Sequence, residues 1–154
     1  LENFEPGYRS KMVLHQHHEL AREFGLKGVH LPEYFRTSLK ETLEDYVNTF
    51  QHLKFTVSTS FHQKEEISRT SIFDYCFLSP IFNSISKTGY VGKTFQVLDI
   101  QQKVIALGGI DAAKIPLAYN MGFYGVAVLG AVWLQEDPIH SFIKIQQQYE
   151  SVFN

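Results

Sequence analysis

Short apolar runs recur along this chain, separated by longer stretches of mixed character. The runs are bounded mostly by glycine, proline or polar residues, a pattern typical of short β-strands. The six runs are residues 11–14, 28–31, 55–58, 74–78, 104–107 and 125–129. The last two are apolar at successive positions, so both of their faces should be buried, as in a parallel sheet covered by helices.

Helical patterns lie between and after these runs. One amphipathic helix is predicted by apolar residues spaced at intervals of four and three, namely Leu39, Leu43, Val47 and Phe50. Shorter helical segments are expected over residues 19–24, 63–67 and 95–102.

A terminal helix is predicted to begin at Asp137 and Pro138, because Asp is a good N-cap and Pro suits the first turn. Its apolar face would consist of Ile139, Phe142, Ile143, Gln146 and Tyr149. Trp133 should pack the last strand against this helix.

Alternation of strands and helices implies parallel pairing through right-handed crossovers. Two α/β architectures fit one domain over residues 1–154: an open doubly wound sheet, and a (β/α)8 TIM barrel whose first two strand-helix units are missing from the chain. Gly108, Gly109 and Gly130 end the last two strands and favour the barrel, because barrel phosphate sites are commonly built there.

These glycines also predict a ligand. Bare backbone N–H groups at the carboxyl ends of two neighbouring strands can approach an anion closely, and a following helix N-terminus adds partial positive charge. Phosphate is the expected ligand at Gly108, Gly109, Leu129 and Gly130. The alternative is a pair of tight strand-to-helix turns that bind nothing.

The segments 105–110 (IALGGI) and 122–131 (GFYGVAVLGA) resemble the last two strands of thiamine phosphate synthase and its relative, the thiazole tautomerase TenI. The resemblance runs from Lys11 to about Leu134 and makes the six strands numbers three to eight of an eight-stranded barrel. It implies small phosphorylated substrates: a thiazole phosphate on the glycine backbone and, for the synthase, a pyrimidine diphosphate.

The loop that follows 74–78 resembles the family segment ending in Thr-x-Thr-Lys. The resemblance implies that Ser84 and Ser86 hold the thiazole phosphate and that Lys87 meets the diphosphate. Two hydroxyls and one ammonium at a strand's carboxyl end can clamp an anion and stabilise charge on a leaving group. The alternative is a solvated surface loop.

Ser60-Phe61-His62 resembles the family's Ser-x-His. By that resemblance Ser60 lies near the reacting pyrimidine in the synthase, and His62 moves a proton on the thiazole ring in the tautomerase. Histidine suits proton transfer because its pKa lies near neutrality. The alternative is a helix N-terminus capped by Ser60, with Glu65 or Glu66 as the nearby carboxylate.

Two departures from the synthase concern its magnesium ligands. His15-Gln16-His17 stands where the synthase has Asn-Asp-Asp, and Glu33 is displaced by two positions from a second aspartate. Mg²⁺ is therefore implied only for a synthase, with no evident ligands. The tautomerase also lacks these aspartates and carries a tyrosine where this chain has Tyr34, so the site looks closer to the tautomerase. His15 and His30 become candidates for substrate binding.

Two further alternatives stay open. The first is a non-catalytic phosphate-ligand binder or regulator that kept the anion site. The second is a metal-dependent hydrolase, because a His15-x-His17 pair at a strand end, with His30 and His62, is a common zinc or iron pattern. Otherwise these histidines bond to backbone, while His18 and His52 lie exposed on helices.

The composition narrows the class of protein further. A formal net charge of −2 leaves no electrostatic footprint for nucleic acid. The longest apolar runs fall far short of the roughly 20 residues of a membrane span. The single Cys76 can form no internal disulfide, which fits a cytoplasmic protein. A homo-oligomer is left open.

The chain begins at Leu1 without methionine, and the resemblance assigns an Arg and a Lys for the diphosphate to the unseen second strand. We expect the native protein to be longer. A six-stranded remnant would keep open edges and should be unstable or aggregate.

Overall fold

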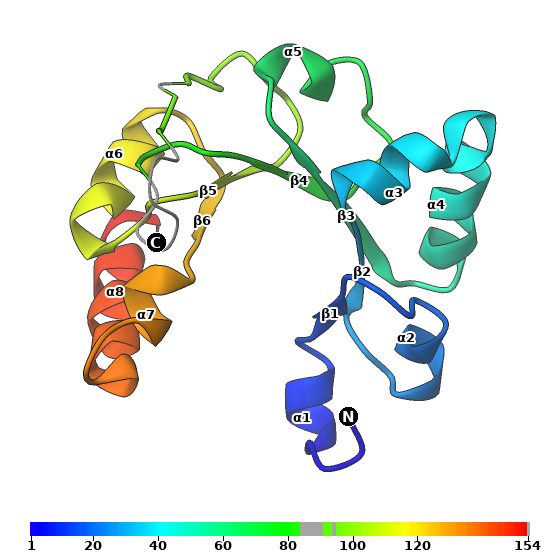
Figure 1. Cartoon of the computed structure of the whole chain (residues 1–154), viewed down its shortest axis with the longest axis horizontal. Helices are drawn as coiled ribbons and strands as arrows, with labels where there is room; N and C mark the ends of the chain where they lie inside the picture. Colours follow the sequence, from blue (N-terminus) through cyan, green and yellow to red (C-terminus); the bar gives the residue numbers. More distant parts are fainter. Residues whose placement is uncertain (84–90, 94, 154) are drawn as a thin grey trace. The chain divides into compact units, whose positions relative to one another are not determined.

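The structure is a computed structural model that describes residues 1–83, 91–93 and 95–153 (Figure 1). The chain forms two compact units. Unit 1 comprises Leu1–Ser60 and Thr70–Tyr75, and unit 2 comprises Phe61–Arg69 and Cys76–Asn154. Among the described residues, no helix combines the length and the apolar character that a membrane span requires.

Unit 1 contains three parallel strands in sequence order, with helices between them. The strands are β1 (Val13–Leu14), β2 (Gly28–Leu31) and β3 (Thr56–Phe61), whose last residue, Phe61, belongs to unit 2. The helices are α1 (Pro6–Arg9), α2 (Leu20–Glu23), α3 (Glu33–Ser38), the 3-10 turn η1 (Lys40–Thr42) and α4 (Leu43–His52). The register aligns Val13 with Gly28, and His30 with Ser58.

The core of unit 1 lies where β2 and β3 meet the helices. Every residue of β2 is buried, and Val29, Val47 and Val57 have no exposed surface. Val47 is the buried residue of α4, so the predicted amphipathic helix is confirmed, although it begins later than the pattern suggests. Helix α3 was not predicted. Pro32 not only ends the strand but is also the residue from which α3 begins.

Unit 2 contains the other three parallel strands, again in sequence order. They are β4 (Tyr75–Leu78), whose first residue, Tyr75, belongs to unit 1, β5 (Val104–Leu107) and β6 (Gly125–Ala127). The register pairs Cys76 with Val104, and Leu107 with Ala127. The other elements are α5 (Lys64–Ile67), the 3-10 turn η2 (Ala112–Lys114), α6 (Ile115–Asn120), α7 (Gly130–Trp133) and α8 (Pro138–Phe153).

The six predicted strands are therefore confirmed, and the fold is α/β with parallel strands. Within each unit the strands follow the order of the chain, without the reversal that marks a doubly wound sheet. Completion to an eight-stranded barrel by two further units stays a prediction.

The expected helix over residues 95–102 is wrong. This segment is an irregular loop with a turn at Leu98 and Asp99. Long-range contacts override its local pattern: the buried Val97 donates its N–H to the carbonyl of Met121 at 2.9 Å, and Asp99 pairs with Lys64 at 2.6 Å.

Helix α8 packs against α6, α7 and η2 (Figure 1). Asp137 caps its first turn by accepting the N–H of His140 at 2.9 Å, as predicted. The apolar face predicted from the sequence is not the buried face, however. Ile145 is the buried residue of α8, whereas Ile139 is 74% exposed. The packing prediction for Trp133 is also wrong, because α7 buries Gly130, Ala131 and Val132 and leaves the indole 70% exposed.

Candidate functional site

The carboxyl ends of β5 and β6 form one edge of unit 2, which we call the glycine edge: Gly108, Gly109, Leu129, Gly130 and Ala131. Gly108 and Gly109 have φ angles of +98° and +66°, where glycine is strongly preferred. A Cβ on Gly108 would lie 2.9 Å from Cα of Pro80. A Cβ on Gly109 would lie 2.8 Å from the carbonyl carbon of Phe82. Both glycines therefore let the segment after β4 approach β5 closely.

Backbone donors remain available at this edge. The N–H groups of Gly109, Gly130 and Ala131 donate to no acceptor among the described residues. Gly130 and Ala131 open α7, where the first N–H groups of a helix have no partner within it. Such donors suit an anion, although close packing by itself also accounts for Gly108 and Gly109.

His62 follows β3 directly and lies in unit 2. Within unit 2, the carbonyl of Phe61 accepts the N–H of Ser79 at 3.1 Å. His62 Nδ1 lies 2.9 Å from the carbonyl oxygen of Ser79 and 3.3 Å from its Oγ. A carbonyl only accepts, so Nδ1 carries the proton. In neutral His62 the lone pair is therefore on Nε2, the nitrogen that can take up a proton.

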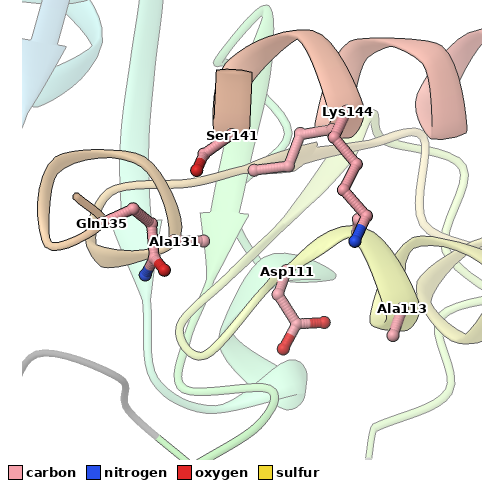
Figure 2. Close-up of a pocket in the computed structure, with 8 residues that line it drawn as sticks. Asp111, Ala113, Ala131, Gln135, Ser141 and Lys144 are labelled. Atoms are coloured by element: carbon pink, nitrogen blue, oxygen red, sulfur yellow. The ribbon is translucent and has the colours of Figure 1, made fainter. Parts of the chain in front are cut away.

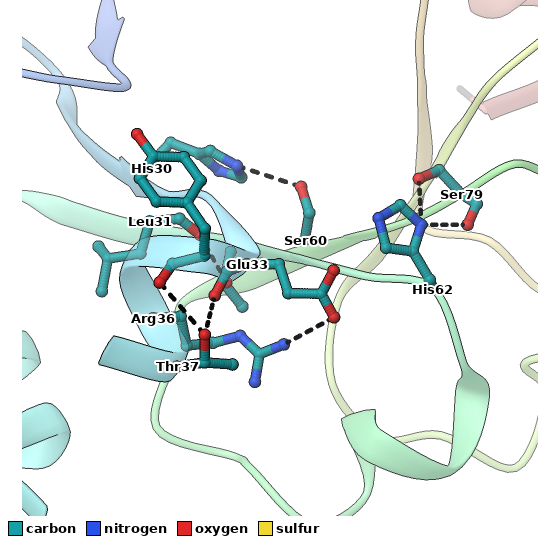
Figure 3. Close-up of polar contacts among 10 residues, drawn as sticks. His30, Leu31, Glu33, Arg36, Thr37, Ser60, His62 and Ser79 are labelled. Carbon is teal, nitrogen blue, oxygen red and sulfur yellow. Dashed lines mark hydrogen bonds and ion pairs between the residues drawn. The ribbon is translucent and has the colours of Figure 1, made fainter. Parts of the chain in front are cut away.

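Ser60, the other candidate of the Ser60-Phe61-His62 motif, lies in unit 1, and its hydroxyl does not cap a helix. Its Oγ lies 3.1 Å from Nε2 of His30 (Figure 3). Helix α5 has Gln63 at its N-cap and no side-chain capping bond. The capping alternative for Ser60 is therefore not supported.

His30 lies at the centre of a polar cluster in unit 1. Its Nδ1 is 3.0 Å from Oγ of Ser58, and its ring centroid is 4.4 Å from that of His15. The carbonyl of His30 accepts from Nε2 of His18 at 3.1 Å, and Nδ1 of His18 lies 2.9 Å from the hydroxyl of Tyr46. His18 is thus buried, and the expectation that it lies exposed on a helix is wrong.

Burial sets the protonation of these histidines. Burial, helped by the neighbouring His15 and His18, lowers the pKa of His30 to about 4. Burial likewise lowers the pKa of His18 and raises that of the Tyr46 hydroxyl. His30 is therefore a neutral hydrogen-bonding group at neutral pH, with one donor nitrogen and one acceptor nitrogen.

Each unit also contains a surface pocket. In unit 1, a pocket of about 260 Å³ is lined by residues 15–19, Tyr34, Phe35 and Tyr46. In unit 2, a pocket of about 420 Å³ lies between η2, α7 and α8, and Figure 2 shows Lys144 reaching from α8 towards η2. There Asp111 already accepts from the backbone N–H of Lys114 at 3.1 Å and from its ammonium at 2.6 Å. The sequence did not single out this second pocket.

A family model described as thiamine monophosphate synthase matches residues 5–132. The chain belongs to this family. A thiamine-phosphate synthase of Bacteroides fragilis (strain YCH46) is 28% identical over 147 residues, covering 87% of this chain and 69% of that protein. The resemblance seen in the sequence is therefore confirmed.

Two solved structures are similar to this chain. A thiamine phosphate pyrophosphorylase from Bacteroides thetaiotaomicron is 26% identical, with a TM-score of 0.67 over 96% of this chain and 74% of that one. Another from Pyrococcus furiosus has a TM-score of 0.69 over 92% of this chain and 68% of that one. At 18% identity, the second shows the fold alone.

Magnesium, which the synthase resemblance implies, does not fit the described residues of this family member. Mg²⁺ prefers carboxylate and water oxygens, whereas His15 and His17 offer ring nitrogens. Glu33 faces Arg36 of its own helix at 3.9 Å. The described residues contain no group of three or more His, Cys, Asp or Glu side chains that could hold a metal ion. The hydrolase alternative gains no support from this arrangement.

The other predicted site residues divide into two groups. Ser84, Ser86 and Lys87 lie outside the described residues, so their roles stay predictions. The Leu129 side chain is 63% exposed, so a role in phosphate binding falls to its backbone. The partners Ser58, Tyr46 and Ser79 were missed, because no local signal links them to histidines 17 to 28 residues away.

Acid should destabilise this family member through His30. The unfolded chain binds a proton near pH 6.5 and the folded chain only near pH 4, so the free energy of unfolding falls as pH drops through that window. The shift corresponds to ~3 kcal/mol. Urea unfolding at pH 7 and pH 4.5 should show a smaller pH effect in His30→Gln than in wild type. An equal pH effect in both would contradict the prediction; the exposed His140→Gln is the control.

Proposed function

We propose that the protein acts in thiamine biosynthesis on a phosphorylated thiazole whose phosphate is held by the glycine edge. The donors there support this proposal, because the N–H groups of Gly109, Gly130 and Ala131 have no acceptor among the described residues. Ser84 and Ser86 would add hydroxyls from the loop after β4.

Proton transfer on the thiazole is the reaction that the described geometry favours. The bond to the Ser79 carbonyl at 2.9 Å leaves the lone pair of neutral His62 on Nε2. In a TenI-like tautomerisation, Nε2 takes a proton from one ring position and returns it to another, so His62 ends as it began. This step needs no metal ion, which agrees with the poor fit of these residues to Mg²⁺.

Coupling is the second candidate, and the relatives' names favour it. A thiamine-phosphate synthase joins thiazole phosphate to hydroxymethylpyrimidine diphosphate and releases pyrophosphate. In that reaction Lys87 and Ser60 would lie at the diphosphate, where an ammonium and a hydroxyl can stabilise the departing charge.

Three measurements on the purified protein separate these functions. Thiazole phosphate should bind measurably, and absence of binding would contradict the proposal. Formation of thiamine phosphate from both substrates with magnesium would establish the synthase, provided that Lys87→Ala lowers the rate by roughly 10²-fold or more. Lys93→Ala removes a neighbouring exposed lysine and is the matched control.

No coupling product, together with turnover in a tautomerisation assay, would establish the isomerase. Binding without turnover in either assay would leave a non-catalytic binder or regulator.

A further inference from the structure

One imidazole in unit 1 bridges two serine hydroxyls. His30 on β2 is only 3% exposed, and β2 pairs with β3 so that His30 lies opposite Ser58. Ser58 and Ser60 are two residues apart on β3, so their side chains point to the same side of the strand. His30 therefore meets Ser58 Oγ through Nδ1 at 3.0 Å and Ser60 Oγ through Nε2 at 3.1 Å.

The neutral imidazole must donate to one serine and accept from the other. Ser58 has no exposed surface, and among the described residues its hydroxyl has no side-chain partner except Nδ1 of His30. A buried hydroxyl proton without an acceptor is costly. Ser58 therefore donates its proton to Nδ1, which leaves the ring proton of His30 on Nε2.

The consequence falls on Ser60. Nε2–H of His30 donates to Ser60 Oγ, which occupies one lone pair of the serine and leaves the hydroxyl proton free of the imidazole. Ser60 is only partly buried, so this proton can be offered to a ligand. If the ring proton of His30 were on Nδ1 instead, Ser60 would donate its own hydroxyl proton to Nε2 and could not offer it to a ligand.

We propose that His30 is a positioning residue, locked by Ser58 in its Nε2–H form, that sets Ser60 as a hydrogen-bond donor to an acceptor atom of the substrate. The inference rests on the proposed function only in taking Ser60 as a site residue. A phosphate or diphosphate oxygen is the acceptor class that best suits a hydroxyl held in this way.

The ring form can be measured directly and without turnover. Nitrogen NMR of the ¹⁵N-labelled imidazole at pH 7 should show His30 with its proton on Nε2 and a bare Nδ1. Ser58→Ala removes the donor that locks the ring, so it should shift the equilibrium towards Nδ1–H. A wild-type ring with its proton on Nδ1 would overturn the proposal.

Two amide substitutions of His30 test the link to Ser60. The amide of His30→Gln can place an N–H where Nε2–H lies, whereas that of His30→Asn reaches only as far as Nδ1. The readout is kcat/KM in the assay, coupling or tautomerisation, in which the wild type is active. We expect His30→Asn to lower this kcat/KM by about tenfold to a hundredfold, and His30→Gln to stay within about threefold of wild type.

Equal losses in the two variants, with native circular dichroism in both, would overturn the positioning role. A wild type inactive in both assays would instead contradict the proposed function. In that case the binding of inorganic pyrophosphate replaces kcat/KM as the readout, and the same order of the variants is expected.

Discussion

His62→Asn should abolish most of the proposed tautomerisation activity while leaving the protein folded. The asparagine amide can still donate to the Ser79 carbonyl in place of Nδ1, which lies 2.9 Å from that oxygen in the native protein. It has no group equivalent to the basic Nε2. Removal of a general acid-base should lower kcat by roughly 10²- to 10⁴-fold with little change in KM. Steady-state kinetics on the thiazole carboxylate phosphate would measure this.

Two controls separate chemistry from structure at His62. Ser79→Ala removes the hydroxyl 3.3 Å from Nδ1 but keeps the carbonyl, so its kcat should stay within about threefold of wild type. His62→Ala removes both nitrogens and should be no more active than His62→Asn. A His62→Asn variant with near-native kcat would show that His62 does not transfer the proton.

Gly109→Ala should be strongly destabilising. The new Cβ would collide with the backbone carbonyl oxygen of Asn83 and lie 2.8 Å from the carbonyl carbon of Phe82. Backbone atoms cannot rotate away as a side chain can, so the segment after β4 must shift. The clash and the φ angle of +66° together should cost ~3 kcal/mol in the free energy of unfolding.

Gly25→Ala isolates the conformational part of that cost. Gly25 has a φ angle of +60°, close to that of Gly109, but a Cβ there would meet nothing within 4 Å. It should therefore lose only ~1 kcal/mol. Urea or thermal unfolding followed by circular dichroism measures both variants. Equal losses would mean that the close approach of the segment after β4 contributes nothing to stability.

Several features of this protein follow from local pattern alone. The six strands formed where short apolar runs are bounded by breaking residues, and the helix cap at Asp137 formed where its type predicts one. The double glycine and the segment around it also pointed to the family, since a motif is carried by contiguous residues. Local signals fail where a long-range contact competes, as at Val97, whose bond to Met121 replaced the expected helix.

The hydrophobic period of α8 identified a helix but not its buried side. Ile139 and Phe142 satisfy the period and are exposed, while Ile145 is buried against the rest of unit 2. Helix formation depends on neighbouring residues in the chain, whereas the buried side depends on where α6, α7 and η2 happen to lie.

The sequence by itself determined the strands, the glycine edge and the identity of Ser60 and His62 as candidates. Only the tertiary structure decided what their atoms can do. The proton position on His62 depends on the carbonyl of Ser79, and that on His30 depends on the buried hydroxyl of Ser58. Ser58 lies on the neighbouring strand, and Ser79 is the residue that follows β4. A ring proton is assigned by the acceptor or donor that burial places beside it, which no local pattern records.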